Sequence, residues 1–317
     1  MSALKLLGLD STDSVQQNYT DGQSQTRDAF SFKWSRRESY ESEAFQANTQ
    51  RWLYERYCGG DPAELDRWLT KPGQLILDAG CGAGHSAIVF FGDRLKAHHY
   101  LGIDVSSAAQ VARERFRQAG LPGDFLQVGI SEFDAPKESF DLIFSEGVLH
   151  HTDDTRASLG SLVSKLKVSG RIAFYVYARK AAIREFTDDF IRGKLSEMTD
   201  ELAWKALEPL TKLGVALGEI DAVIDVPEDI PYLGIKRGKL DLQRFFYWNI
   251  CKMYYRPEFS FDEMNHINFD WFRPLNCHRH TPDEIREWCS EFSLDIERLD
   301  VQEAGITVVA TRGRRKA

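Results

Sequence analysis

Glycines and carboxylates follow two apolar stretches of the chain in an order that suits a nucleoside. Residues 75–84 read Leu-Ile-Leu-Asp-Ala-Gly-Cys-Gly-Ala-Gly, an apolar run that leads directly into a glycine-rich turn. Glycines let the backbone turn tightly and approach a bound molecule closely, and they expose amide groups at the start of the next helix. Asp104 ends the next apolar run, 20 residues after Gly84, where a carboxylate can accept hydrogen bonds from two ribose hydroxyls. These features predict a nucleoside site at the ends of two strands.

The glycine spacing favours one kind of nucleoside cofactor. A dinucleotide-binding turn has the spacing GxGxxG, whereas here the glycines stand at positions 80, 82 and 84, with Asp78 ahead of them. That carboxylate would repel a diphosphate, but it suits the polar end of a methionine moiety. The chain here resembles the class I methyltransferases that use S-adenosylmethionine (SAM), through DAGCGAG, LGIDVS, SFDLIFSEGVLHH and SGRIAF. The resemblance covers about residues 72–178 and the last 40 residues.

The resemblance implies a set of cofactor contacts. Asp78 and the glycine turn would hold the methionine moiety, and Asp104 would hold the ribose. Residues after the third strand would flank adenine, and the end of the fourth strand would lie beneath the sulfonium. The cofactor residues implied in this way are Asp78, Gly80, Cys81, Gly82, Gly84, Asp104, Val105, Ile130, Ser131, Ser145 and Glu146. The family often has an acidic residue directly after the third strand, whereas Glu132 comes slightly later here.

A tryptophan ahead of the glycine turn is a further cofactor candidate. Residues 30–37 read Phe-Ser-Phe-Lys-Trp-Ser-Arg-Arg. This segment is similar to the leading segment of small-molecule members of the family, which lies over the cofactor. Trp34 would then cover the SAM pocket, and the alternative is an ordinary anchoring tryptophan.

Three residues are candidates for contact with the reacting groups. Methyl transfer from a sulfonium is an in-line displacement, so the protein mainly positions the acceptor, excludes water and, for some acceptors, removes a proton. His150 follows the predicted fourth strand, and Tyr175 and Tyr177 share one face at the end of the fifth, because strand side chains alternate. For the tyrosines, packing beneath the following segment is the alternative. A histidine pair at this position is common in the family even where no proton moves.

An aromatic-rich segment after the fifth strand is the candidate acceptor region. The twelve aromatics of residues 230–276 could close over an anionic or planar acceptor like a lid, together with Arg244, Arg256, Arg273 and the nearby Arg279. The alternative is that the aromatics form the core of a small helical subdomain. Residues 265–274 hold too many polar groups among their aromatics for a pure core. We expect acceptor contacts from His151, His266, Asn268, Trp271, Arg273 and Arg279.

The same sequence pattern that places these residues also predicts the fold class. Short apolar runs alternate with helix-like segments such as 107–119 and 156–166; the runs are 74–78, 100–104, 125–128, 141–144 and 171–177. Continuous apolar strands joined by helices are typical of a parallel sheet covered on both faces. A helix at 281–292 and strands at 294–299 and 306–311 complete the pattern. We therefore expect an α/β fold with a doubly wound, mostly parallel seven-stranded sheet.

The alternation is interrupted once, which gives a predicted domain organisation. It comprises a helical N-terminal cap (1–71), a SAM-binding Rossmann-like core (72–180), a helical, aromatic-rich insertion after the fifth strand (181–276), and the last helix and two strands of the core (277–317).

Composition narrows the function classes. The chain has 317 residues, of which 43% are hydrophobic and 28% charged, with a formal net charge of −8. Nothing supplies the broad positive field that nucleic acid or an acidic membrane attracts, and no apolar run is long enough to span a bilayer. The five cysteines form no CxxC pair, and Cys277–His280 has no second cluster to complete a metal site. We expect a cytoplasmic protein without a metal, for which a homodimer stays open.

The expected function is SAM-dependent methyl transfer to a small molecule of specialised or cell-surface metabolism. Other SAM chemistry on the same fold is the main alternative, namely cyclisation or transfer of the aminocarboxypropyl arm, which releases methylthioadenosine. A tRNA acceptor is less favoured, because the charge is negative and Ser145–Val148 stands where amino-methylating nucleic-acid enzymes carry Asn or Asp, Pro-Pro and an aromatic residue. A non-catalytic SAM-binding protein is a third hypothesis.

Overall fold

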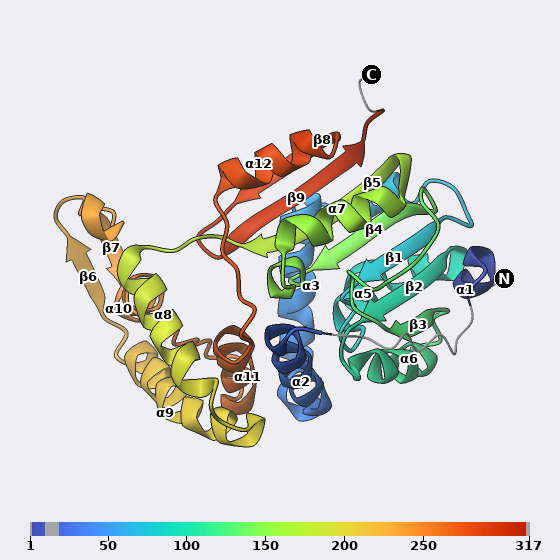
Figure 1. Cartoon of the computed structure of the whole chain (residues 1–317). Coiled ribbons are helices and arrows are strands. Elements are labelled where there is room, and N and C mark those ends of the chain that lie inside the picture. The colour runs from blue at the N-terminus through green and yellow to red at the C-terminus, as the bar shows by residue number, and fades with distance from the viewer. Residues whose placement is uncertain (1, 10–18, 315–317) are drawn as a thin grey trace.

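A seven-stranded sheet forms the centre of the molecule (Figure 1). The computed structural model describes residues 2–9 and 19–314. Residues 1, 10–18 and 315–317 of the predicted end segments lie outside the described residues. The strand order is β3-β2-β1-β4-β5-β9-β8. The strands are β1 (Leu75–Ala79), β2 (His99–Asp104), β3 (Asp124–Gln127), β4 (Phe140–Glu146), β5 (Leu166–Tyr177), β8 (Leu294–Val301) and β9 (Gly305–Arg312).

Five strands run parallel, and the last strand reverses the pattern. The neighbours β3, β2, β1, β4 and β5 pair in parallel, while β9 is antiparallel to both β5 and β8. The order reverses between β1 and β4, so these strands leave a crevice beyond their carboxyl ends. The predicted doubly wound, mostly parallel sheet is confirmed.

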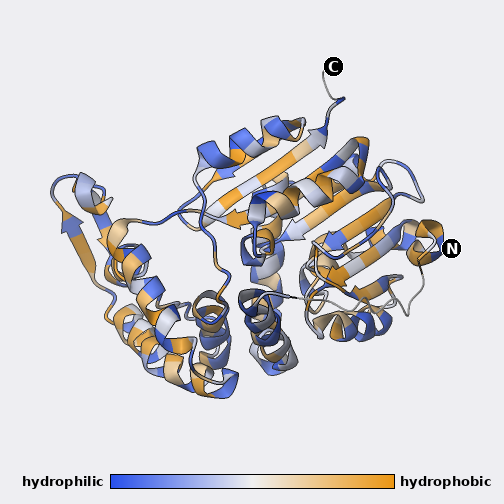
Figure 2. Cartoon of the chain, viewed as in Figure 1, coloured by the Kyte–Doolittle hydropathy of each residue, from blue (hydrophilic) through white to orange (hydrophobic). Residues whose placement is uncertain are grey.

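Helices cover both faces of the sheet, because alternate strand residues point in opposite directions. Ile76 of β1 joins the apolar cluster beneath α3 (Glu43–Cys58), α5 (His85–Phe91) and α6 (Ala108–Gln118). Leu77 joins the opposite cluster, which contains residues of α1 (Ala3–Leu7), α7 (Thr155–Lys165) and α12 (Pro282–Glu291). Figure 2 shows the central strands as the most hydrophobic part of the ribbon.

The N-terminal region is helical, as its sequence predicts. Thr20 and Ser42 accept hydrogen bonds from backbone amides at the starts of α2 (Asp21–Ser35) and α3, and thereby fix where these helices begin. The short α4 (Glu64–Trp68) follows. Helix α2 stands between the sheet and the inserted segment, and it contacts both α6 and α11 (Phe261–Phe272) (Figure 1). It therefore forms one wall of the space at the carboxyl ends of the strands.

The chain leaves the sheet after β5 and returns at α12. Between them lie α8 (Ala182–Leu195), α9 (Asp200–Glu219), β6 (Val223–Val226), β7 (Gly238–Asp241), α10 (Leu242–Asn249) and α11. Short 3-10 turns occur at Arg37–Ser39, Gly92–Ala97, Leu149–His151 and Pro231–Leu233. The antiparallel pair β6–β7 was not predicted, since each strand has only four residues and alternate exposed positions.

Candidate functional site

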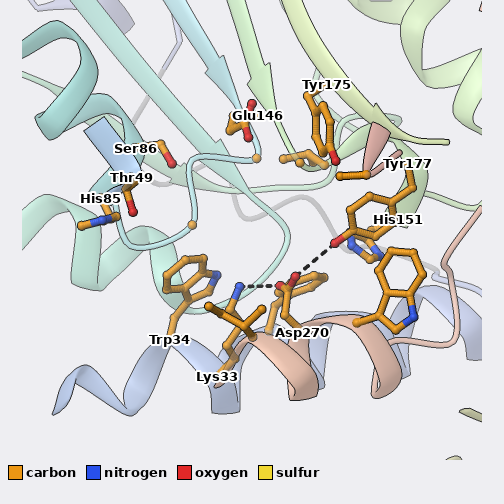
Figure 3. A pocket seen from close by; sticks show the side chains of 18 of the residues that line it. Lys33, Trp34, Thr49, His85, Ser86, Glu146, His151, Tyr175, Tyr177 and Asp270 are labelled. Carbon is orange, nitrogen blue, oxygen red and sulfur yellow. Dashed lines mark hydrogen bonds and ion pairs between the residues drawn. The ribbon is translucent and has the colours of Figure 1, made fainter. Parts of the chain in front are cut away.

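A cavity of about 600 Å³ lies at the carboxyl ends of β1, β2, β4 and β5 and extends to the inserted helices. One face of α2 closes it, because Thr26, Phe30 and Lys33 are spaced to point the same way from a helix. Helix α3 adds Phe45 and Trp52 to the lining. The site thus has two ends, one at the glycine turn and one beneath the insertion (Figure 3).

The glycine turn after β1 has a shape that only glycine tolerates. Gly80 and Gly82 have φ angles of 87° and 50°, and both line the cavity with Cys81. A Cβ on Gly80 would stand 2.3 Å from Val148, and one on Gly82 would stand 2.9 Å from the Trp34 ring. Trp34 therefore packs directly over the turn. The turn leaves room for a ligand next to bare backbone.

Gly84 lies outside the cavity lining and has a different role. It precedes α5 with a φ of 72°, and a Cβ there would stand 3.0 Å from Phe116 of α6. The glycine at this position allows close packing of helices beneath the turn. The structure gives Gly84 a packing role, and its predicted cofactor contact stays a prediction.

Two buried carboxylates border the turn. The Tyr100 hydroxyl donates to Asp78 at 2.6 Å, and burial raises the pKa of Asp78 to about 7. Asp104 accepts hydrogen bonds at 2.8 Å from the amides of Gly82 and Ser106, and one from the Ser106 hydroxyl. Burial raises the pKa of Asp104, and these donors oppose that change. Both side chains line the cavity. Each can still accept a hydrogen bond from a ligand, since a carboxylate can accept about four.

The loop after β3 forms the far wall of this end. Ile130 and Ser131 line the cavity opposite Asp104 and Val105, as the sequence resemblance implies for residues flanking a flat base. Glu132 lines it as well, and a Cβ on Gly129 would stand 2.1 Å from its carboxylate. The acidic residue that comes late in the sequence thus folds back over the loop and supplies an acceptor at the wall.

The end of β4 carries Glu146, a predicted cofactor residue, which is paired with an arginine that the sequence did not single out. Glu146 lines the cavity and pairs with Arg56 of α3 at 2.6 Å, and the Tyr57 hydroxyl donates to its other oxygen. The Arg56 guanidinium lies 3.4 Å from the ring centroid of Trp52 and 3.6 Å from that of Tyr175. Burial raises the pKa of Glu146, and Arg56 opposes the rise. Arg56 was missed because nothing near position 56 in sequence marks it.

Ser145 lies outside the cavity lining. Its side chain is fully buried, and its hydroxyl donates to the Ala79 carbonyl at 2.8 Å. This bond ties β4 to the end of β1. Ser145 therefore supports the end of β1 just ahead of the glycine turn, and its predicted cofactor contact stays a prediction.

The two tyrosines of β5 both line the cavity, and Tyr177 is hydrogen-bonded to a residue of the insertion. Tyr177 donates to Asp270 of α11 at 3.1 Å, and Asp270 pairs with Lys33 of α2 at 2.5 Å (Figure 3). Burial raises the pKa of Tyr175 and of Tyr177 well above 10. At neutral pH both hydroxyls remain protonated. The Lys33–Asp270–Tyr177 contact joins cap, insertion and sheet.

The two histidines after β4 are placed differently. His150 is fully buried outside the cavity lining, with its ring 3.7 Å from the Tyr177 ring. The Tyr177 ring packs against it, and the predicted contact of His150 with the reactants stays a prediction. His151 lines the cavity, and its Nδ1 lies 2.6 Å from the Asn276 carbonyl. Because a carbonyl only accepts, Nδ1 carries the proton and Nε2 keeps its lone pair.

The predicted acceptor residues divide into two groups. His266 and Trp271 of α11 line the cavity. Asn268, Arg273 and Arg279 do not line it, and their predicted contact with an acceptor stays a prediction. Asn268 accepts from the Tyr254 amide, Arg273 pairs with Asp200 at 2.7 Å, and Arg279 pairs with Glu185 and Asp189. Their polar groups form hydrogen bonds and ion pairs that stabilise the insertion.

The insertion contributes lining residues that the sequence reasoning did not single out. Lysines and arginines stand among aromatic rings at this end; the lining includes Lys180, Arg184, Arg244, Tyr247, Trp248, Lys252, Tyr254 and Arg256. Arg244 and Arg256 were anticipated as pocket residues, whereas Lys180, Arg184 and Lys252 were not. Single lysines between helices give no sequence signal for a site.

Among the described residues there is neither a metal-binding cluster nor a membrane-spanning helix. Within residues 2–9 and 19–314, no cluster of three or more His, Cys, Asp or Glu residues could hold a metal ion. No helix among those residues combines the length and apolarity that a membrane crossing requires.

The fold and this site define a class of protein, namely a nucleoside-binding α/β domain with its ligand at the switch point of the sheet. Residues 77–172 match the family model described as a methyltransferase domain. Residues 77–172 are thus a methyltransferase domain, which supports the resemblance to the class I SAM-dependent methyltransferases that the sequence motifs predict. The cofactor of this family is SAM.

The curated relatives match less than half of the chain. Phosphoethanolamine N-methyltransferase 1 of Arabidopsis thaliana is 28% identical over 143 residues, which cover 44% of this chain and 28% of the relative. A tRNA U34 carboxymethyltransferase of Shewanella piezotolerans is 35% identical over 102 residues, covering 31% and 30%. The chain thus spans about a third of the length of these curated relatives. The crystal structure of magnesium protoporphyrin IX methyltransferase from Synechocystis PCC 6803 is 14% identical, with a TM-score of 0.48, and covers 94% of this chain and 100% of the other.

The residues at the glycine turn fit the family's cofactor. Gly80 and Gly82 leave backbone open to the cavity, Asp78 offers a carboxylate to an ammonium group, and Asp104 can accept from ribose hydroxyls. The chain's own donor and acceptor set therefore matches the nucleoside and amino-acid parts of SAM.

Proposed function

We propose that the protein transfers a methyl group from SAM to a small-molecule acceptor held between the sheet edge and the segment 181–276. The observation that carries this proposal is the continuity of one cavity, which joins the glycine turn and Asp104 to the insertion helices. An acceptor beneath the insertion would lie in the same enclosed space as the cofactor, so both can be aligned and shielded from water.

The glycine-turn end of the cavity binds the cofactor in this proposal. Asp78 and the turn hold the amino-acid part, Asp104 holds the ribose, and Ile130, Ser131 and Glu132 surround the base. Trp34 covers the turn. The bound cofactor supplies an activated methyl group, so the chain mainly has to orient the two reactants.

The insertion end positions the acceptor. Tyr175 and Tyr177 remain protonated at neutral pH, so they donate hydrogen bonds and do not take up a proton. His151 is neutral, because burial lowers its pKa to about 4, and its Nε2 has no hydrogen-bond partner among the described residues. That nitrogen can accept a hydrogen bond from a hydroxyl or amine of the acceptor. His151, rather than His150, is the histidine that we place beside the nucleophile.

Product analysis tests the proposal. The purified protein is incubated with SAM, with and without a mixture of small-molecule extracts, and the nucleoside products are separated by liquid chromatography and mass spectrometry. Methyl transfer predicts acceptor-dependent S-adenosylhomocysteine. Methylthioadenosine from SAM alone would instead show cyclisation or transfer of the aminocarboxypropyl arm. Turnover only with added tRNA would move the acceptor to nucleic acid.

A further inference from the structure

Three cationic groups surround the indole of Trp271 at the insertion end of the cavity. The ammonium nitrogen of Lys252 lies 4.8 Å from the ring centroid, and that of Lys180 lies 5.5 Å from it. The guanidinium carbon of Arg184 is also at 5.5 Å. All four side chains line the cavity. Lys180 follows β5, Arg184 lies in α8 and Lys252 precedes α11. The three cations are therefore brought together only by the fold.

The carboxylates around this cluster are already engaged by other groups. Asp188 accepts from Arg184 at 2.7 Å and from the Trp271 indole at 2.7 Å. Glu185 pairs with Arg279, and Asp270 pairs with Lys33. No ion pair of Lys180 or Lys252 occurs in the part of the chain that the structure describes. The cluster therefore holds more positive than negative charge.

Among the three cations, Lys252 has the fewest hydrogen-bond partners for its charged group. Its side chain is buried, with 6% of the residue exposed, and its ammonium group has no hydrogen-bond partner among residues 2–9 and 19–314. The ammonium group of Lys180, by contrast, donates to the carbonyls of Ala178 and Ala304 at 2.7 and 2.8 Å. A buried charge without a counterion is costly. In keeping with this, burial lowers the pKa of Lys252 to about 8 and that of Lys180 to about 7.

We propose that Lys180, Arg184 and Lys252 form a subsite for an anionic group of the acceptor, a carboxylate or a phosphate. The inference rests on the proposed function, whose acceptor it narrows to one that carries such a group. An anion between the lysines would supply a negative charge that the cluster lacks. It would also accept hydrogen bonds from the unpaired N–H groups of Lys252. The neighbouring rings of Tyr247, Trp248 and Trp271 suit an apolar or planar body attached to the anion.

A pair of probes that differ only in charge tests the subsite. 2-Naphthoate and its uncharged analogue 2-naphthamide are titrated into the wild-type protein by calorimetry, without SAM. The naphthoate is expected to bind about tenfold more tightly or better, because charge-assisted hydrogen bonds are stronger than neutral ones. Inorganic phosphate is then added as a competitor. Displacement of naphthoate by phosphate would assign both anion types to the subsite, and lack of displacement would restrict it to carboxylates.

Variants assign the effect to the cluster. Lys252→Met keeps the length of the side chain and removes its charge, so it should abolish the preference for naphthoate, and Lys180→Met should reduce it. Lys205→Met, at an exposed position of α9, is the control and should leave the preference unchanged. Circular dichroism verifies folding of each variant. If one lysine variant fails to fold, the other decides.

The outcomes separate this proposal from the proposed function. Equal binding of naphthoate and naphthamide by the wild type, no binding of naphthoate, or an unchanged preference in the folded lysine variants would overturn the anion subsite. SAM affinity, measured in parallel, should be the same in Lys252→Met and wild type. Failure of the wild type to bind SAM would instead overturn the proposed function, whatever the probes show.

Discussion

The two ends of the cavity are built in different ways. At the glycine-turn end, Asp78, Gly80 and Gly82 are neighbours in sequence, and Asp104 follows on the adjacent strand. At the insertion end, Tyr177, Lys252 and Trp271 come from segments far apart in the chain. The first end offers carboxylates and bare backbone, whereas the second offers cations and aromatic rings. A family's shared cofactor can be served by a short local motif, while an acceptor site depends on how a whole insertion packs.

The largest expected effect concerns the glycine turn. Gly82→Val should abolish SAM binding, since a Cβ there would lie 2.9 Å from Trp34 and a valine would also block the cofactor's approach to the backbone. Gly120→Val is the matched control, because Gly120 has a similar φ of 65° and open space around it. The measurement is calorimetric titration with SAM. Wild-type affinity in a folded Gly82→Val protein would refute the placement of the cofactor.

The second largest effect concerns the ion pair between Lys33 of the cap and Asp270 of the insertion, which should stabilise the insertion end of the cavity. Asp270→Asn leaves Lys33 buried without its counterion, so we expect the free energy of unfolding to fall by about 2–3 kcal/mol. Asp93→Asn, in an exposed pair with Lys96, should change it by less than about 0.5 kcal/mol. Urea denaturation followed by fluorescence measures both. Equal effects of the two substitutions would show that the buried contact does not hold the insertion to the cap.

A ribose contact should have a smaller but specific effect. Asp104→Ala should weaken SAM binding by about 1–3 kcal/mol, through the loss of charged hydrogen bonds. Asp141→Ala, at the opposite end of β4, also removes a carboxylate that accepts a backbone amide, but it lies outside the cavity. Calorimetry should therefore show SAM affinity unchanged in that control. If both variants bind SAM equally well, Asp104 is not the ribose ligand.

The smallest expected effect is a pH dependence of cofactor binding. Asp78 has a pKa raised to about 7 by burial, so below pH 7 it is mostly protonated in the unliganded protein. An ammonium group needs the carboxylate form, and SAM affinity should fall toward about tenfold per pH unit below 7. The histidines His85 and His151, with pKa values lowered to about 3 and 4, do not titrate in this range.

The variant Asp78→Asn isolates this group. It should bind SAM more weakly than wild type but with little change in affinity between pH 6 and 8. A wild-type affinity that stays constant across this range would contradict the assigned role of Asp78.

The sequence predicted the strands and the turn of the cofactor end because their signals are local. Apolar runs fix β1 and β2, and the glycines that follow have φ angles that other residues avoid. Gly84 and Ser145 were assigned to the ligand because each stands in a family motif, and in the structure they support the turn by packing and hydrogen bonding. Position in a motif does not distinguish a contact from its support.

At the acceptor end, the sequence did not show which polar groups line the cavity, and the reason is physical. Asn268 and Arg273 drew attention as polar groups among aromatics, but buried polar groups must be satisfied wherever they lie. Their partners Tyr254 and Asp200 stand inside the insertion itself. The pairing of Arg56 with Glu146, and the place of Lys252 in the cavity lining, became visible only when α3 and the segment before α11 were placed beside the sheet.

Titration of the purified protein with SAM tests the central claim most directly. We expect one SAM per chain to bind the wild type, with binding lost in Gly82→Val and retained in Lys252→Met. That pattern would place the cofactor at the glycine turn and keep the insertion end for the acceptor. No binding to the wild type, or equal binding to the wild type and to Gly82→Val, would contradict the account.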